Sequence, residues 1–405
     1  MMVNRSKLET VKAILTSEYW LIVSLCGAFF AFFALNRGGA VIFIHACFVF
    51  LILNFVFKEY RIGHVPVSFW VTLAVFAYLL GASVLFHPKL SHYRWMTYPV
   101  RMLGIVFAIH CLSIKNFKNW FVILFCAVLT AAVCWQLIAF HIFKMKWGTF
   151  SNPHYIASFS MLALPAIVYF LWVAKGWYKL IFIPIAVLDF DLVLEIGSRP
   201  AIAAITIATL FALFFLVHDR RKWLGVLSIG VFFVVLYATG YLGLADRLED
   251  LIVNLPREDR VQIWTATWTL LKDNSLLAWI VGNGIGTFRL IWPQYAPPDE
   301  INEVFPHGFF LEVLYASGLV GLIVFVGATI LLFVYSIRAL KKIADRKIGL
   351  FVRIMLVELI AWMIHCGLTF PIYSKYSQYS LAFILGPLLA VLANKSLTLS
   401  ESDFK

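Results

Sequence analysis

The hydrophobic positions of this chain fall into long uninterrupted runs that are separated by polar stretches. The runs are close to the ~20 residues that a helix needs to cross the hydrocarbon of a bilayer. They do not alternate with a period of two, as the strands of a membrane barrel would. The pattern therefore predicts twelve membrane-spanning helices, at 19–35, 39–57, 67–86, 97–113, 121–143, 155–174, 178–197, 201–217, 223–244, 308–337, 350–370 and 379–393.

The composition supports the same class of protein. Hydrophobic residues make up 62% of the chain and charged residues only 13%, which excludes a soluble core wrapped in a polar surface. We therefore expect an all-α polytopic membrane protein with a single membrane domain over residues 1–405. Nine spans lie within 19–244 and three within 308–393. Between them is a long external segment at 245–306, and a cytoplasmic tail follows at 394–405.

The distribution of basic residues indicates the orientation. An even number of spans places both termini on one side, and the loops and helix ends of that side hold 20 of the 33 lysines and arginines. Five of the other 13 lie in the long segment, where the positive-inside rule counts charge weakly. Both termini are therefore predicted to be cytoplasmic and segment 245–306 external. The net charge of +12 then reflects topology, and no nucleic-acid partner is expected.

Cysteines, histidines and glycines do not form a cofactor-binding pattern. All six cysteines lie in predicted spans without metal-ligand spacing, so we expect no disulfide and no zinc. Several histidines stand singly on apolar spans. Gly282-Asn-Gly-Ile-Gly286 is not G-x-G-x-x-G and follows no strand of a βαβ unit, which excludes a nucleotide site of that kind. Neither a metal, a cofactor nor a nucleotide is expected.

We expect the chemistry in the long external segment. It carries Arg257, Arg260 and Arg289, and it ends where His307 meets a membrane boundary. Its nine acidic residues outnumber its five basic ones, so a bound anion must be held by individual arginines and not by the field of the whole segment. The structural alternative is that Arg257 and Arg260 only reach toward phospholipid headgroups.

Within this segment, residues 261–271 predict a short amphipathic helix that suits the bilayer interface. One helical face would hold Val261, Trp264, Trp268 and Leu271.

Arg199 stands in a tight external turn, Gly197-Ser198-Arg199-Pro200, between two apolar runs. A guanidinium at a membrane boundary is costly unless it is paired or hydrated, so such residues often mark functional sites. The structural alternative is an ion pair with one of three preceding acids, Asp189, Asp191 or Glu195.

Further residues on the external side are candidates for substrate binding. Arg101 lies about one turn into the fourth span, and Asn152 belongs to Asn152-Pro153-His154 before the sixth. The full set of expected substrate-binding residues is Arg101, Asn152, Arg257, Trp264 and Arg289, in addition to the candidate catalytic residues Arg199, Arg260 and His307.

A lipid-linked pyrophosphate is the substrate that suits external arginines and one histidine without nucleotide or metal. Arginine forks bind phosphate oxygens and stabilise the charge that grows on a pyrophosphate leaving group. A neutral histidine accepts the proton of an attacking hydroxyl. The activated donor itself supplies the energy for transfer.

The stretch 97–393 resembles the bacterial O-antigen ligase and O-antigen polymerase superfamily of integral-membrane glycosyltransferases. No single motif is specific, but their order and topology together are. The shared pieces, in chain order, are Asn152-Pro153 before a span, Ser198-Arg199 at an external turn, Arg260-x-x-Ile-Trp264 in the long segment, Gly282-x-Gly-x-Gly286, Pro306-His307 and Gly318-Leu-Val-Gly-Leu322.

The resemblance implies a glycan donor linked to undecaprenyl pyrophosphate, whose pyrophosphate contacts Arg199 and Arg260, and a role for His307 in transfer. It also implies an inverting, metal-independent reaction at the periplasmic face of the bacterial inner membrane. The family often has His-Asn where this chain has His307-Gly308, so any role of that asparagine is absent here.

Ligase and polymerase share these motifs and differ in acceptor. The ligase transfers to the lipid A-core oligosaccharide, and the polymerase to a growing glycan on its lipid carrier. Twelve spans with one moderate external loop favour the ligase, with the polymerase as the alternative and a protein-directed oligosaccharyltransferase third. A transporter of lipid-linked glycan is the alternative of another class, but no inverted repeats or clearly broken helices indicate it.

Overall fold

The computed structural model describes residues 18–35, 37–57, 100–109, 119–146, 152–217, 222–240, 259–298, 305–369 and 374–393, with a few shorter stretches. Every complete element among them is a helix, which confirms the all-α class. The labelled elements are α2 (Glu18–Phe30), η1 (Ala31–Leu35), α3 (Arg37–Val56), α6 (Asn119–Leu137), η4 (Ile138–Ile142), α7 (Pro153–Val173), η5 (Gly176–Tyr178), α8 (Lys179–Ile196), α9 (Arg199–Phe211), η6 (Ala212–Leu216), α10 (Lys222–Ala238), α12 (Asp259–Lys272), α13 (Leu276–Val281), α14 (Phe288–Ile291), η9 (Trp292–Gln294), α15 (Phe309–Leu340), α16 (Arg346–Leu368) and α17 (Lys375–Ala393).

Six of the described helices are long and apolar enough to cross a membrane: Val122–Ile142, His154–Val173, Arg199–Leu216, Phe309–Leu340, Arg346–Leu368 and Tyr376–Ala393. Four shorter apolar helices, Tyr19–Phe30, Ala40–Asn54, Val100–Ile109 and Lys222–Ala238, also coincide with predicted spans. The predicted span at 178–197 forms α8, which carries four charged residues. Most of the predicted span at 67–86 lies outside the described residues, so the count of twelve stays a prediction.

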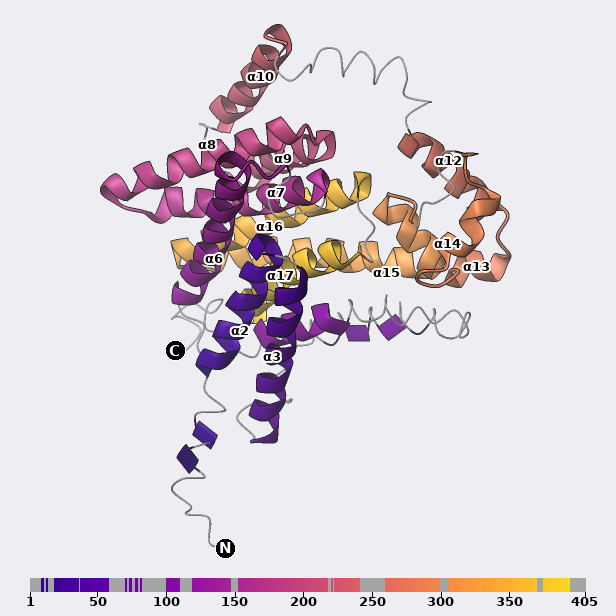
Figure 1. Ribbon diagram of the computed structural model, residues 1–405, viewed down its shortest axis with the longest axis horizontal. Helices are drawn as coiled ribbons and strands as arrows, with labels where there is room; N and C mark the ends of the chain where they lie inside the picture. Colours follow the sequence, from indigo (N-terminus) through magenta and orange to yellow (C-terminus); the bar gives the residue numbers. More distant parts are fainter. Residues whose placement is uncertain are drawn as a thin grey trace, which may run out of the picture.

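Helix α16 forms the centre of the bundle. It packs against α7, α9, α15 and α17, while α7 also contacts α6 and α8, and α2 pairs with α3 (Figure 1). The core around α16 contains large side chains that are fully buried, among them Phe351 and Trp362. These contacts bring helices from both halves of the chain side by side, so the site described below draws on segments far apart in sequence.

One end of the bundle gathers the starts of α7, α9, α15 and α17 and the carboxyl end of α16. At the opposite ends of these helices lie basic connections, with Lys175 and Lys179 between α7 and α8, and Arg338, Lys341 and Arg346 around the turn from α15 to α16. These connections belong to the side that the sequence predicts to be cytoplasmic, and the orientation itself stays a prediction.

Residues 259–298 form a small helical unit, here called the cap, beside the first turns of α15 (Figure 1). Its own core includes Ile263, Phe288 and Trp292, which pack with Tyr315 of α15. The expected amphipathic helix is present as α12, but Ile263, Thr267, Leu270 and Leu271 form its buried side. Trp268 of the expected apolar face is 43% exposed, because tertiary contacts with α15 and not the tryptophans select the buried face.

Helix α15 is interrupted at Gly318, whose φ of 64° and ψ of −169° are not helical. The 22 residues that follow, 319–340, form about 33 Å of helix, enough to cross the hydrocarbon alone. The helical turns before the break, residues 309–317, are then not needed to cross the hydrocarbon and pack against the cap. A single predicted span at 308–337 therefore corresponds to two helical pieces with different roles.

The cap is joined to this break by main-chain hydrogen bonds. The N–H groups of Asn283 and Gly284 donate to the carbonyls of Tyr315 and Ala316, at 2.7 and 3.0 Å. A carbonyl before a helix break loses its usual partner four residues on, so these bonds satisfy groups that the break leaves exposed. Gly282 is the residue where the two backbones meet, because a Cβ there would overlap with main-chain atoms of Ala316. The glycine motif that begins at Gly282 therefore allows the cap to pack closely against α15.

Candidate functional site

His307 stands at the elbow between the cap and α15. Its backbone has a φ of 50°, in the left-handed region that few non-glycine residues adopt. The ring is half-buried, and Nδ1 lies 3.1 Å from the carbonyl oxygen of Thr369. A carbonyl only accepts hydrogen bonds, so Nδ1 carries a proton, and in the neutral ring the lone pair is then on Nε2. This contact fixes the orientation of the His307 ring.

Arg260, in the first turn of α12, reaches the same end of α16. Its Nη1 donates to the carbonyl oxygen of Leu368 at 2.5 Å and to the Thr369 hydroxyl at 3.4 Å. The last carbonyls of a helix have no partner within the helix and carry the negative end of its dipole, so they attract a cation. The carboxyl end of α16 therefore anchors Arg260 and His307 together, although they are 47 residues apart.

Trp264 lies one turn after Arg260 on the same face of α12. Its indole packs over the backbone of Gly308, where an added Cβ would lie 3.1 Å from Nε1. The indole N–H is buried and has no hydrogen-bond partner among the described residues. Such a donor beside His307 is suited to an oxygen of a bound ligand. A side chain at position 308 would therefore press against this ring.

His154 connects the turn at Arg199 to this group. Arg260 and His307 both lie within electrostatic range of its imidazole. Its Nδ1 is 3.4 Å from the hydroxyl of Ser198, the residue that precedes the first residue of α9. Ser198 is buried and Arg199 is exposed. The beginnings of α7 and α9 thus bring two more polar groups to the end of the bundle that holds Arg260 and His307.

Asn152 and Arg101 lie at this end of the bundle, and each makes a hydrogen bond to another residue of the protein. Asn152 is the N-cap of α7, since its side-chain oxygen accepts from the His154 N–H at 2.8 Å. Arg101 donates through Nη1 to the hydroxyl of Tyr379 on α17, at 3.4 Å. The side chain of Arg101 therefore points from its own helix toward α17. Contact of either residue with a substrate stays a prediction.

Arg289 and Arg257 are less closely tied to the site. Arg289 is an exposed residue of α14, and its neighbour Phe288 packs edge-on against Tyr315, eight residues beyond His307. Arg257 lies outside the described residues.

The sequence patterns did not single out His154 or Thr369 as site residues. His154 was visible only as part of the tripeptide before α7, and Thr369 is an ordinary residue at the end of an apolar run. Its role comes from main-chain geometry, which no residue type reveals. The buried His365, one turn earlier on α16, is also within electrostatic range of His154 and Arg260.

Together these residues form a cationic site with an oriented imidazole at one end of a helical membrane bundle. Arginine and indole N–H groups bind phosphate oxygens, and the lone pair of Nε2 accepts a proton. The fold and the site thus define a polytopic membrane protein with a cationic site at one end of its helical bundle.

Comparison with known families gives the same class. Residues 184–326 match the family model described as O-antigen ligase. This match confirms the resemblance to the O-antigen ligase/polymerase superfamily, whose activity is of the glycosyltransferase type. No match to the chain was found among curated proteins. The matched region extends from α8 into α15 and so includes Arg199, Arg260, His307 and Gly318, whereas His154 and Thr369 lie outside it.

Proposed function

We propose that this protein is an O-antigen ligase, which transfers a glycan from undecaprenyl pyrophosphate to the lipid A-core oligosaccharide at the periplasmic face of the bacterial inner membrane. The observation that carries the proposal is the common anchoring of Arg260 and His307 on the carboxyl end of α16. It supports a site in which a phosphate-binding cation and a general base act on the same donor.

In this proposal the arginines hold the pyrophosphate. The guanidinium of Arg260, which α16 holds through Nη1, binds phosphate oxygens in this scheme. Arg199, exposed beside Ser198, contributes a second guanidinium. Both would stabilise the negative charge that develops as the glycosidic oxygen leaves with the pyrophosphate. The indole N–H of Trp264 supplies a further donor.

His307 acts on the acceptor in this scheme. Nε2 takes the proton from the acceptor hydroxyl as its oxygen attacks the anomeric carbon and the bond to the pyrophosphate breaks. One direct displacement inverts the anomeric configuration and needs no protein nucleophile. Metal independence is expected because arginines, in place of a metal ion, carry the charge of the leaving group.

The reaction is tested by incubating purified protein in detergent with EDTA, without nucleotide, in the presence of glycan-linked undecaprenyl pyrophosphate and lipopolysaccharide that lacks O-antigen. A ligase joins the glycan to lipid A-core. Longer lipid-linked glycan without that product would instead assign the polymerase reaction. If neither product forms, the glycosyltransferase proposal fails, and transport of the lipid-linked glycan becomes the reading to test.

Replacing Arg260 tests the phosphate-binding role. Arg260→Ala should raise the KM for the donor roughly 10- to 100-fold, because a hydrogen bond to a charged group contributes about 1.5–3 kcal/mol. Arg260→Lys should recover only part of this loss, since an ammonium lacks the planar fork. The matched control is Lys272→Ala, at an exposed position in the last turn of the same helix. Equal KM values for Arg260→Ala and Lys272→Ala would contradict the assignment.

A further inference from the structure

Arg199 follows a serine whose side chain does not cap its own helix. Ser198 precedes α9, and the hydroxyl of a serine at this position usually accepts a hydrogen bond from an N–H of the first turn. Here the main-chain carbonyl of Ser198 accepts from the N–H groups of Ala201 and Ile202, at 3.0 and 3.1 Å, and Pro200 has no N–H. The Ser198 hydroxyl makes no cap bond and is therefore left for another partner.

That partner is His154, at the start of α7. Its Nδ1 lies 3.4 Å from the hydroxyl oxygen of Ser198, a residue that is only 1% exposed. Buried hydroxyls are normally hydrogen-bonded, and this one joins two turns that are 44 residues apart in the chain. The contact ties the turn that carries Arg199 to α7.

The start of α7, where His154 stands, is itself held by two contacts. The side-chain oxygen of Asn152 caps the helix by accepting from the N–H of His154, at 2.8 Å. Tyr155, the next residue, stacks on Tyr376 of α17 with ring centroids 3.7 Å apart. A side chain on a backbone that is fixed in this way can hold another group in place.

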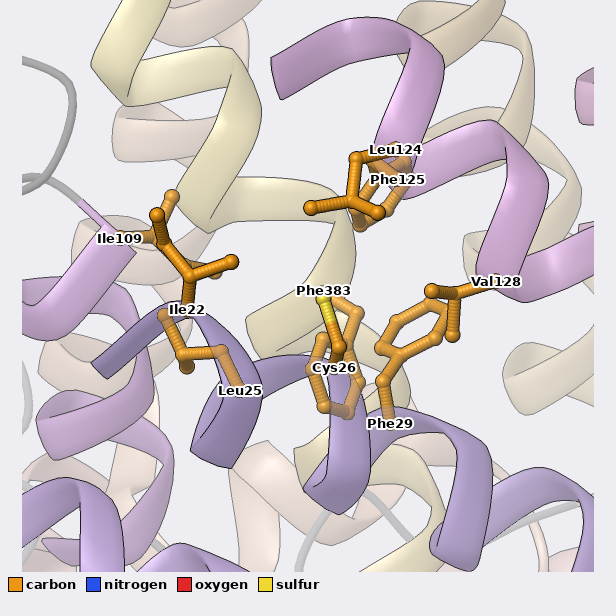
Figure 2. Close-up of a pocket in the computed structure, with 9 residues that line it drawn as sticks. All are labelled: Ile22, Leu25, Cys26, Phe29, Ile109, Leu124, Phe125, Val128 and Phe383. Carbon is orange, nitrogen blue, oxygen red and sulfur yellow. The ribbon is translucent and has the colours of Figure 1, made fainter. Parts of the chain in front are cut away.

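Helix α17 is in turn fixed by packing in the apolar part of the bundle. Phe383 of α17 meets Phe29 of α2 edge-on, with ring centroids 3.8 Å apart. Figure 2 shows both rings beside Phe125 of α6, around one small apolar space. The position of His154 is therefore set by the bundle, through Tyr155 and Tyr376, and not by the turn at Arg199.

Apolar packing holds the same turn in a less specific way. Ala157, Val193 and Ala201 form a small buried cluster between α7, α8 and α9. Apolar contacts are non-directional, whereas a hydrogen bond requires a particular distance and angle. The cluster keeps the three helices together, and the hydrogen bond to His154 adds the orientation of the turn.

We propose that His154 is a positioning residue, which holds Arg199 in place for the pyrophosphate of the donor through the hydroxyl of Ser198. The inference rests on the proposed function, in which Arg199 binds that pyrophosphate. Because a displacement of about 1 Å can cost about 10²-fold in rate, a small shift of the turn is enough to weaken the site. His154 acts through Arg199 and needs no contact with the donor.

Substitutions at His154 distinguish this role from a general structural one. His154→Ala should raise the KM for the donor about 3- to 10-fold, as expected when one hydrogen bond is lost. His154→Asn should restore most of this loss, because its amide group lies as many bonds from the backbone as Nδ1 does. The amide of His154→Gln is one bond farther away and should not restore it. Equal KM values for the Asn and Gln variants would overturn the proposal.

Double-mutant cycles test the route through Ser198 and Arg199. Ser198→Ala removes only the hydroxyl and should raise the KM as much as His154→Ala does, and the double variant should raise it no further. In an Arg199→Ala background, His154→Ala should leave the KM unchanged. Ser228→Ala, which removes an exposed hydroxyl on α10, is the matched control and should keep the wild-type KM. Additive effects of His154→Ala and Arg199→Ala would contradict the proposal.

The two proposals fail in different ways. If the wild type transfers glycan and His154→Ala has the wild-type KM, packing alone positions Arg199, and the ligase proposal stands. If no glycan is transferred, the same variants are compared by their Kd for undecaprenyl pyrophosphate. The same pattern of losses in Kd would support the role of His154 and assign another reaction, whereas equal Kd values for the wild type and His154→Ala would overturn that role.

Discussion

Replacing His307 by asparagine should slow glycan transfer by about 10²- to 10⁴-fold while leaving donor binding nearly unchanged, which is the loss expected when a general base is removed. Asparagine is chosen because it tolerates the left-handed conformation that His307 adopts, with φ at 50°, better than most residues. The backbone at the elbow is then kept, and only the base is lost. Single-turnover transfer and donor binding, measured separately on the same purified variant, distinguish the two effects.

A matched histidine provides the control for this substitution. His45 on α3 also places Nδ1 against a main-chain carbonyl, that of Val41 at 2.7 Å, but its side chain is exposed. His45→Asn should transfer glycan at the wild-type rate. If His307→Asn lost donor binding and transfer to the same extent, or retained full activity, the role of His307 as a base would be wrong.

Gly318→Ala should destabilise the protein by about 3 kcal/mol or more and abolish most activity. A Cβ at Gly318 would overlap with main-chain atoms of Ile280 and Val281, and φ at 64° is itself costly for alanine. Main-chain atoms cannot move aside as a flexible side chain does, so the cap should separate from the break in α15. Thermal unfolding in detergent should shift downward by at least about 5 °C.

Gly327, on the same helix, is the appropriate comparison. A Cβ there meets nothing within 4 Å, and its conformation is helical, so Gly327→Ala should be neutral or stabilising by up to about 1 kcal/mol. Gly282→Ala should resemble Gly318→Ala, because it faces the other side of the same contact. Wild-type stability of Gly318→Ala would show that the cap does not depend on this contact.

Much of the fold followed from local pattern. A run of apolar residues near ~20 in length can satisfy its backbone polar groups within a bilayer only as a helix, so predicted ranges such as 155–174 and 379–393 closely match α7 and α17. The interruption of α15 did not follow in this way. Gly318 can adopt either helical or left-handed angles, and the contact with the cap selects between them.

Within the site, residue type indicated some members and not others. Arg199, Arg260 and His307 stand out in the sequence because charged and titratable groups are rare and costly at a membrane boundary. Their placement at one end of the bundle depends on where α9, α12 and α15 begin in space. The buried face of α12 shows what residue periodicity alone could not predict. The pattern allowed more than one apolar side, and packing against α15 decided which side is buried.

The sequence by itself determined the class of this protein, because membrane hydrocarbon permits only one arrangement for long apolar runs and because charge is sorted across the bilayer. It also identified the rare charged and titratable residues at the membrane boundary as candidate members of one site. Only the tertiary structure decided that the carbonyl of Thr369 would orient His307, that Leu368 would hold Arg260, and that the cap would close on Gly318. These are main-chain contacts between distant segments, and main-chain groups are the same at every residue, so no sequence pattern distinguishes them.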